Sequence, residues 1–201
     1  MNRRSLGCLF ELLETFLVTL VIFILIQLFV AQPYQVQKQS MENTLMPNQY
    51  VLVDKLTPNF DSLHRGDIVV FNPPSSAKEP SGTQYAERVI GIDGDTVEIH
   101  GGHVYLNGSL LNEAYVLKNQ TTNMPDGGNG SWKLKSGQLF VMGDNRPDAA
   151  ASDSRTLGPI DKSSVIGRVW MRYWPFNDFG LIPQGKQSPA PSGSPVSSTA
   201  P

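Results

Sequence analysis

Cysteine and histidine are both scarce in this sequence. Cys8 is the only cysteine in 201 residues and precedes a long apolar run, so the chain beyond that run has no disulfide and no thiol nucleophile. Of the three histidines, His100 and His103 flank Gly101-Gly102, which is typical of a two-residue hairpin turn, and His64 stands apart. These positions form no metal-ligand pattern, so we expect neither a metal ion nor another cofactor.

Strong charge of either sign is absent too. Lys and Arg number 16 and Asp and Glu number 18, which gives a formal net charge of −2 at pH 7. No cluster of basic residues forms a patch, so the composition gives no support for binding to nucleic acid. Helical periodicity is also lacking after residue 31, apart from one short turn expected near residues 161–165.

Residues 9–31 form one long run rich in Leu, Ile, Val and Phe. At about 1.5 Å per residue, a helix of this length spans about 30 Å, which is enough to cross a bilayer. Arg3 and Arg4 precede the run, and no Lys or Arg follows it before Lys38. The positive-inside rule then predicts that residues 1–8 are cytoplasmic and that the main domain is extracytoplasmic.

A cleaved secretory signal peptide is the alternative interpretation of this run. It requires a shorter apolar stretch and small residues at the cleavage site, whereas Phe29 occupies such a position in Phe29-Val30-Ala31. We therefore predict an uncleaved transmembrane helix at residues 9–31. The protein is expected in the cell membrane, with a single span in contact with membrane lipid.

The two ends leave room for one domain between them. From residue 184 to residue 201 the chain consists mainly of Pro, Ser, Gly, Ala and Thr, and such a segment buries too little apolar surface to offset its conformational entropy. We predict a disordered tail at residues 184–201. Residues 32–183 then form a single extracytoplasmic domain.

Alternation of apolar and polar residues dominates that domain. It predicts strands at residues 50–54, 67–72, 84–92, 96–100, 104–107, 138–142 and 166–173. Gly101-Gly102 and Asn107-Gly108 are short hairpin signals. We therefore expect a mainly β protein, in which the single N-terminal transmembrane helix is followed by a curled, antiparallel, barrel-like β domain.

Four short motifs follow the apolar run in order. They are Ser40-Met41-Glu42-Asn43-Thr44-Leu45, Arg65-Gly66-Asp67-Ile68-Val69-Val70-Phe71, Tyr85-Ala86-Glu87-Arg88-Val89-Ile90-Gly91, and Gly143-Asp144-Asn145-Arg146 followed by Ser152-Asp153-Ser154-Arg155. Each motif alone is common. Together and in this order, over about residues 10–174, they resemble the type I signal peptidase family (signal peptidase I), which consists of membrane-anchored Ser/Lys serine endopeptidases.

This resemblance implies roles for particular residues. Ser40 matches the nucleophile of the family, and Met41 beside it is expected to contact substrate. Arg88 and Asp144 match positions that pair across the site. The other residues expected to frame the site are Arg146, Asp153 and Arg155. The implied partners are the signal peptides of exported preproteins, which bind as an extended strand at an exposed sheet edge near the nucleophile.

The third motif departs from the family pattern at its most important position. The family has Lys-Arg there, with the lysine as general base, whereas this chain has Glu87 before Arg88. A carboxylate near its reference pKa of about 4.3 is a weaker base than a desolvated lysine, and it places negative charge beside a developing oxyanion. The spacer before Ser152-Asp153 is also longer, and the position expected for a supporting serine is alanine.

Two functional hypotheses follow from this departure. The first is a serine endopeptidase that removes signal peptides, with Ser40 as nucleophile and Glu87 in the base position. The second is a catalytically impaired relative that binds extended or signal peptides without cleaving them. Lys38 stands two residues before Ser40, so in an extended segment the two side chains share a face, and Lys38 is either a substitute amine or an interfacial lysine that touches lipid headgroups.

Overall fold

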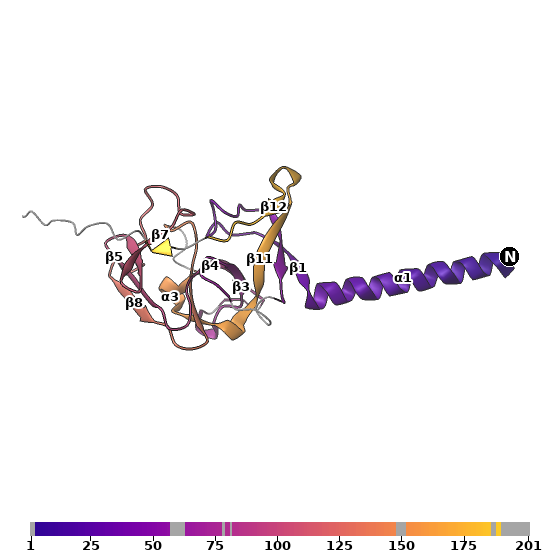
Figure 1. The fold of residues 1–201 in the computed structure, drawn as a ribbon, viewed down its shortest axis with the longest axis horizontal. Coiled ribbons are helices and arrows are strands. Elements are labelled where there is room, and N and C mark those ends of the chain that lie inside the picture. Colours follow the sequence, from indigo (N-terminus) through magenta and orange to yellow (C-terminus); the bar gives the residue numbers. More distant parts are fainter. Residues whose placement is uncertain are drawn as a thin grey trace, which may run out of the picture.

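The N-terminal helix projects away from a β domain. The computed structural model describes residues 3–56, 63–77, 79–80, 82–147, 152–185 and 188–189. In it, α1 (Arg3–Phe29) is a single rod with the N-terminus at its far end (Figure 1). Its segment Phe10–Gln27 has a mean hydropathy of 2.1 and packs against nothing in the protein, so its length and composition suit a membrane span.

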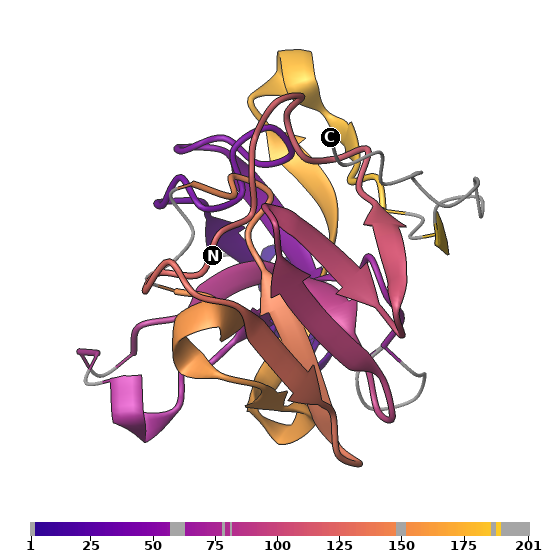
Figure 2. The same ribbon diagram turned by 90° about the vertical axis from the view of Figure 1, so that its left-hand side faces the viewer.

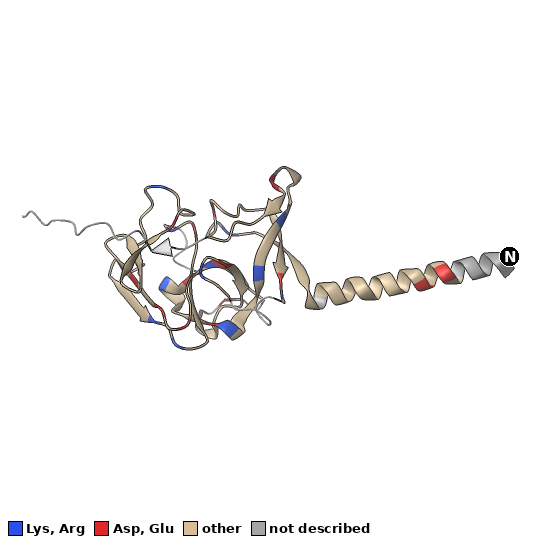
Figure 3. Ribbon diagram, in the orientation of Figure 1, with Lys and Arg blue, Asp and Glu red and all other residues tan. Residues whose placement is uncertain are grey.

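The helix ends where the predicted span was expected to continue. Ala31 already belongs to β1 (Ala31–Gln35), because Pro33 disfavours helical backbone at the residue before it and cannot continue a helix itself. Along α1, Figure 3 shows acidic positions near the N-terminal end, and the helix carries no charged residue from there to the β domain. In the β domain, residues of both charge signs are intermixed along the ribbon.

The larger of two sheets contains eight antiparallel strands. Its order is β1-β2-β11-β3-β4-β9-β10, and β12 also pairs with β11. The bounds are β2 (Tyr50–Asp54), β3 (Ile68–Phe71), β4 (Tyr85–Gly91), β9 (Gln138–Met142), β10 (Ile160–Asp161), β11 (Val165–Trp174) and β12 (Gly180–Leu181). Register shifts in β11 mark irregularities that add to the curl of this sheet.

The smaller sheet has five antiparallel strands in the order β13-β7-β6-β5-β8. They are β5 (Thr96–His100), β6 (His103–Leu106), β7 (Ser109–Asn112), β8 (Gly130–Lys133) and β13 (Ser188–Pro189), and Figure 2 shows this sheet toward the viewer. Gly101 and Gly102 have φ of 58° and 78°, which is the backbone that a two-residue hairpin turn needs. The His100 ring stacks on Tyr105 at 4.1 Å, as suits a hairpin histidine.

Three apolar clusters hold the two sheets together. One packs the segment after β1 against β2, β3 and β11, with Met41 and Leu45 at its centre. A second lies on β3, β4 and β9, and a third joins β4 and β9 to the smaller sheet. The remaining short helices are η1 (Ser75–Ala77), α3 (Ser154–Leu157), η3 (Lys162–Ser164) and η4 (Phe176–Asp178).

The mainly β fold with a curled antiparallel sheet agrees with the sequence-based expectation. The predicted strands 50–54, 96–100 and 138–142 coincide with β2, β5 and β9, and η3 lies in the turn expected near residues 161–165. The short strands β1, β7 and β8 were not predicted, because none has a long alternating pattern and β1 contains Pro33.

The predicted disordered tail begins too early. Gln184 Nε2 donates to the carbonyl of Val169 at 3.0 Å, and the Gly185 amide donates to the carbonyl of Gly66 at 3.2 Å. Ser188–Pro189 then pairs with Leu111 and Asn112 as β13. These main-chain and amide bonds extend the domain past residue 183, and the other residues of the predicted tail lie outside the described part of the chain.

Candidate active site

Ser40 opens a tight turn that is clamped in place by backbone hydrogen bonds. The amides of Thr44 and Leu45 donate to the carbonyl of Met41 at 3.0 and 2.8 Å, and Asn43 adopts a positive φ of 92°. The amide of Asn145 donates to the carbonyl of Ser40 at 2.9 Å. The turn therefore has a fixed position against the segment after β9, with Ser40 only 7% exposed.

A groove of about 490 Å³ leads to Ser40. One wall consists of residues 34–38, which continue from β1 toward the nucleophile, and the other of residues 79–80 and 82–86, which lead into β4. Met41 is 2% exposed and lines the groove while it packs in the core, so its side chain can contact a bound peptide only as part of the groove lining. Lys38 lines the same groove.

Glu87 lies beside Ser40, fully buried in β4. Tyr85, Glu87 and Val89 alternate on one face of this strand, with Tyr85 and Val89 in the same apolar cluster. Glu87 Oε1 accepts a hydrogen bond from Ser152 Oγ at 3.2 Å. Oε2 is buried without a well-formed hydrogen bond among the described residues, although the Ser40 hydroxyl is close enough to influence the carboxyl.

This environment favours the neutral form of Glu87. Burial raises its pKa well above the ordinary value of 4.5, and the negative charge of Asp153 raises it further. Hydrogen bonding by Ser40 and Ser152 lowers the pKa, and the more distant charge of Asp144 raises it, but burial is the largest cause. The raised pKa extends the pH range over which Glu87 is a protonated carboxylic acid, the form that donates a proton instead of accepting one.

Ser152 corrects the expectation that a supporting serine is missing. The residues 148–151 of the longer spacer lie outside the described part of the chain, but Ser152 is 5% exposed and its hydroxyl contacts Glu87. Asp153 follows directly and caps α3 by accepting a hydrogen bond from the Arg155 amide at 2.9 Å. The cap fixes the backbone next to Ser152, whose hydroxyl donates to the Glu87 carboxyl.

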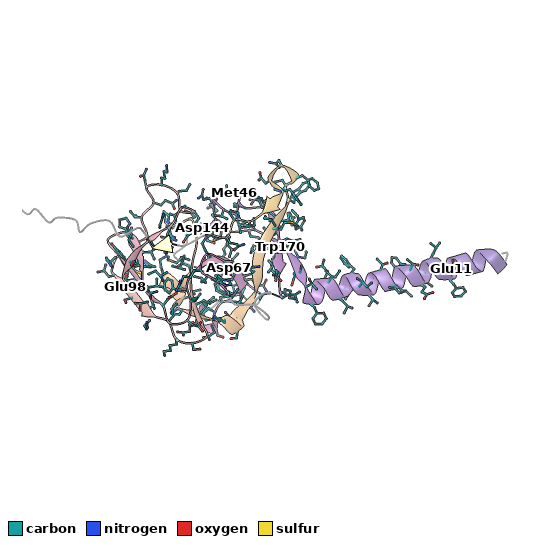
Figure 4. The ribbon with its side chains drawn as sticks, viewed as in Figure 1. Glu11, Met46, Asp67, Glu98, Asp144 and Trp170 are labelled. Atoms are coloured by element: carbon teal, nitrogen blue, oxygen red, sulfur yellow. The ribbon has the colours of Figure 1, made fainter. Side chains whose placement is uncertain are left out.

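Arg88 and Asp144 form the predicted buried ion pair. Arg88 Nε and Nη2 donate to the two carboxylate oxygens at 2.7 and 2.6 Å, and both side chains are inaccessible to solvent. Arg88 Nη1 also donates to the carbonyl of Gly66 at 2.7 Å, and Thr44 Oγ1 donates to Asp144. The pair thus ties the nucleophile turn to β4 and to the segment after β9; Figure 4 labels Asp144 inside the domain.

The other framing residues hold the scaffold around this pair. Arg155 binds Asp153 at 2.8 Å and donates to the carbonyl of Arg146 at 2.9 Å. Arg146 donates to the Gly143 carbonyl at 2.9 Å and binds both carboxylate oxygens of Glu113. All three side chains of the predicted set are buried and point into ion pairs, so they support the site and do not line the groove.

The sequence analysis did not identify Tyr115 and Glu113, which support the site. The ring of Tyr115 lies 4.2 Å from the guanidinium of Arg88 and 6.0 Å from that of Arg146, and its hydroxyl donates to Glu113 at 2.9 Å. Burial raises the pKa of Tyr115 well above 10, so it stays a neutral donor. Neither Tyr115 nor Glu113 belongs to a motif, and no sequence signal pointed to them.

Lys38 does not contact the buried site. Its Nζ lies 4.1 Å from the centroid of the Tyr85 ring, over the face of that ring, within the groove. Burial raises the pKa of Tyr85 to about 12, so this ring stays uncharged. Among the described residues no group of three or more His, Cys, Asp or Glu side chains is placed to hold a metal ion.

An apolar N-terminal helix, which is compatible with membrane anchoring, a curled β domain and a serine that lines a groove are features that suit a serine peptidase. The chain belongs to the signal peptidase family: the family model "Signal peptidase, peptidase S26" matches residues 9–174. This match includes the helix from residue 9 onward, the Ser40 turn and both members of the Arg88–Asp144 pair.

Two relatives identified by sequence agree with this assignment, and one solved structure is also similar. The probable signal peptidase I-1 of Synechocystis sp. is 34% identical over 175 residues, which cover 86% of this chain and 86% of that protein. A signal peptidase I of Leptolyngbya laminosa is 35% identical over 177 residues, covering 87% and 84%. The solved signal peptidase I of Enterococcus faecalis V583 is 31% identical and covers 54% of this chain and 97% of that one, with a TM-score of 0.42.

Proposed function

We propose that this protein binds signal peptides of exported preproteins at the membrane surface and cleaves them with Ser40 when Glu87 is ionised. The observation that carries the proposal is the position of Ser40, which stands at the end of the groove and beside the buried carboxyl of Glu87. In keeping with the charge distribution around α1, we place the N-terminus in the cytoplasm and the β domain outside, with a single membrane span in lipid.

An unpaired stretch of strand offers the peptide a place to bind. β4 pairs with β3 from Tyr85 to Arg88, but its ladder with β9 begins only at Arg88. The other edge of residues 85–87 therefore has no strand partner among the described strands. It borders the groove that ends at Ser40, and an extended peptide can add to it through main-chain hydrogen bonds.

The chemistry requires a proton acceptor for the Ser40 hydroxyl. As Ser40 Oγ attacks the scissile carbonyl carbon, its proton passes to an ionised Glu87, which becomes a carboxylic acid and can return that proton to the leaving amine. An ionised Glu87 with a raised pKa is a stronger base than an ordinary carboxylate. Cleavage is then expected to increase as the pH rises toward the pKa of Glu87.

A second candidate function is peptide binding without cleavage. It is favoured by the raised pKa of Glu87, since a protonated carboxylic acid cannot accept the Ser40 proton. The groove and the strand edge would still bind an extended peptide, because neither depends on the ionisation of Glu87. The two candidates differ in the fate of a bound preprotein, not in how it is recognised.

Cleavage of a synthetic preprotein by the full chain in detergent micelles, followed over a range of pH, tests the proposal. Wild type should cleave slowly at neutral pH and faster at alkaline pH, and Ser40→Ala and Glu87→Gln should both abolish the reaction. Glu87→Lys should increase cleavage at neutral pH, because Ser152 is present to orient the new amine. Preprotein that binds to wild type but is never cleaved would establish the second candidate instead.

Lys38 provides the sharpest control for this experiment. Cleavage that is lost in Ser40→Ala but kept in Glu87→Gln would refute Glu87 as the base. If adding Lys38→Gln to Glu87→Gln then removed the remaining activity, the amine of Lys38 would be the base.

A further inference from the structure

We propose that Lys38 makes the groove selective for peptides that carry an acidic side chain close to the scissile bond. This inference rests on the proposed function, because it concerns the same groove and the same peptide. It adds a charge preference that comes from this chain's own residues on the wall that leads to Ser40.

Lys38 places an ammonium in the groove whose N–H donors have no hydrogen-bond acceptor among the described residues. Its described lining is apolar or uncharged except for Lys38 and Glu79. The ammonium of Lys38 makes no hydrogen bond or ion pair with any residue that the structure describes and has only the face of Tyr85 beneath it, at 4.1 Å. An ammonium group has three N–H donors, so a carboxylate in the groove can accept at least one of them.

Glu79, the acidic residue of the groove lining, already accepts a hydrogen bond from Tyr85. Glu79 Oε1 accepts a hydrogen bond from the hydroxyl of Tyr85, at the edge of the ring whose face lies under Lys38. No ion pair within 4.0 Å joins Glu79 to Lys38. Glu79 therefore fixes the ring and leaves the ammonium available to a ligand.

Tyr85 holds the cation at a defined place. The ring is 3% exposed and packs against Phe71 at 6.0 Å, so it forms a rigid platform. Because its pKa is raised to about 12, it remains a neutral phenol with an attractive π face throughout the physiological range. Less side-chain entropy is lost when a peptide carboxylate meets an ammonium that is already positioned.

The position of Lys38 in the chain places this cation next to the reacting bond. Lys38 precedes Ser40 by two residues on the wall formed by residues 34–38, and both line the groove. A peptide extended along this wall with its scissile carbonyl at Ser40 must pass the ammonium within a few residues of the cut. Side chains alternate along an extended peptide, so only one position, or two positions of the same parity, can face it.

Binding measurements on full-length Ser40→Ala protein in detergent micelles test the inference without any need for cleavage. The probes are fluorescent signal peptides in which Asp, Asn or Lys is placed in turn at each position around the cut. At one position, or at two of the same parity, we expect Asp to bind about three- to tenfold more tightly than Asn, and Lys more weakly. High salt should reduce this preference.

Charge reversal supplies the decisive comparison. In the Ser40→Ala background, Lys38→Gln should remove the preference and Lys38→Glu should transfer it to the Lys peptide. Lys135→Gln, an exposed lysine outside the groove, is the matched control and should change nothing. Equal binding of Asp and Asn peptides at every position, or a preference that survives Lys38→Glu, overturns the inference and leaves the proposed function intact. No binding of any peptide overturns both.

Discussion

The buried carboxyl of Glu87 predicts an unusual dependence of stability on pH. In the folded protein its pKa is raised, first by burial and then by the charge of Asp153. In the unfolded chain the same group has a pKa of about 4.3. Between these two values the folded state keeps a proton that the unfolded state has released, so the free energy of unfolding falls as the pH rises.

Glu87→Gln removes this proton while it keeps the shape of the side chain and an acceptor for Ser152. Below about pH 4 the variant and the wild type should have similar stability, because Glu87 is protonated in both states of the wild type. Above that pH the wild type should lose up to about 1.4 kcal/mol for each pH unit relative to Glu87→Gln. The difference stops growing at the pKa of Glu87 in the folded state, so the plateau measures that pKa.

Urea unfolding of the full chain in detergent, followed by tryptophan fluorescence at a series of pH values, measures this difference. All three tryptophans, Trp132, Trp170 and Trp174, lie in the β domain and report its unfolding. Glu98→Gln on β5, which is far from Ser40 in the sequence and only partly buried, is the matched control. Stability curves for Glu87→Gln and wild type that stay parallel from about pH 4 upward would show that Glu87 ionises in the folded protein at its ordinary pKa, and would refute the argument.

Three further predictions follow. Arg88→Met should lower the free energy of unfolding by about 3–5 kcal/mol, because Asp144 is left buried and unpaired, and adding Asp144→Leu should recover much of the loss in the same urea assay. Tyr115→Leu should lower stability by about 2–4 kcal/mol, whereas Tyr115→Phe should keep most of it, since the ring contacts Arg88 and only the hydroxyl contacts Glu113. Single-turnover cleavage by the wild type should rise about tenfold per pH unit below the raised pKa of Glu87 and then level off, and a rate that is flat from about pH 4 upward would contradict this.

Much of the fold was predictable because the alternation of apolar and polar residues along a strand indicates which face of that strand is buried. The strands β2, β5 and β9 have long enough patterns to give their bounds correctly. The strand β1 has only five residues, including Pro33, and its partner β2 supplies the pairing that makes it a strand. Short edge strands of this kind are specified by tertiary pairing, which local sequence does not record.

Motif order predicted the Arg88–Asp144 pair, although 56 residues separate the two in sequence. It did not predict Tyr115, whose contacts arise only when the smaller sheet packs beside β4. The count of spacer residues also pointed away from Ser152, whereas the capping of α3 by Asp153 brings its hydroxyl to Glu87. The number of residues in a loop does not predict where a side chain lies when the backbone beside it is fixed by the element that follows the loop.

The environment around position 87 explains why the identity of its side chain decides the chemistry. Asp144 and Asp153 each have an arginine partner, Arg88 and Arg155, so neither carboxylate is left uncompensated. Glu87 has no ion-pair partner among the residues that the structure describes and is fully buried, and burial disfavours whichever form of a side chain is charged. For a lysine, the neutral form that burial favours is the amine, which is a base. For a glutamate, the neutral form is the carboxylic acid, which is not. The same desolvation that would prepare a lysine to accept the Ser40 proton therefore favours the protonated form of Glu87, and in the proposed mechanism cleavage depends on the ionisation of this one group.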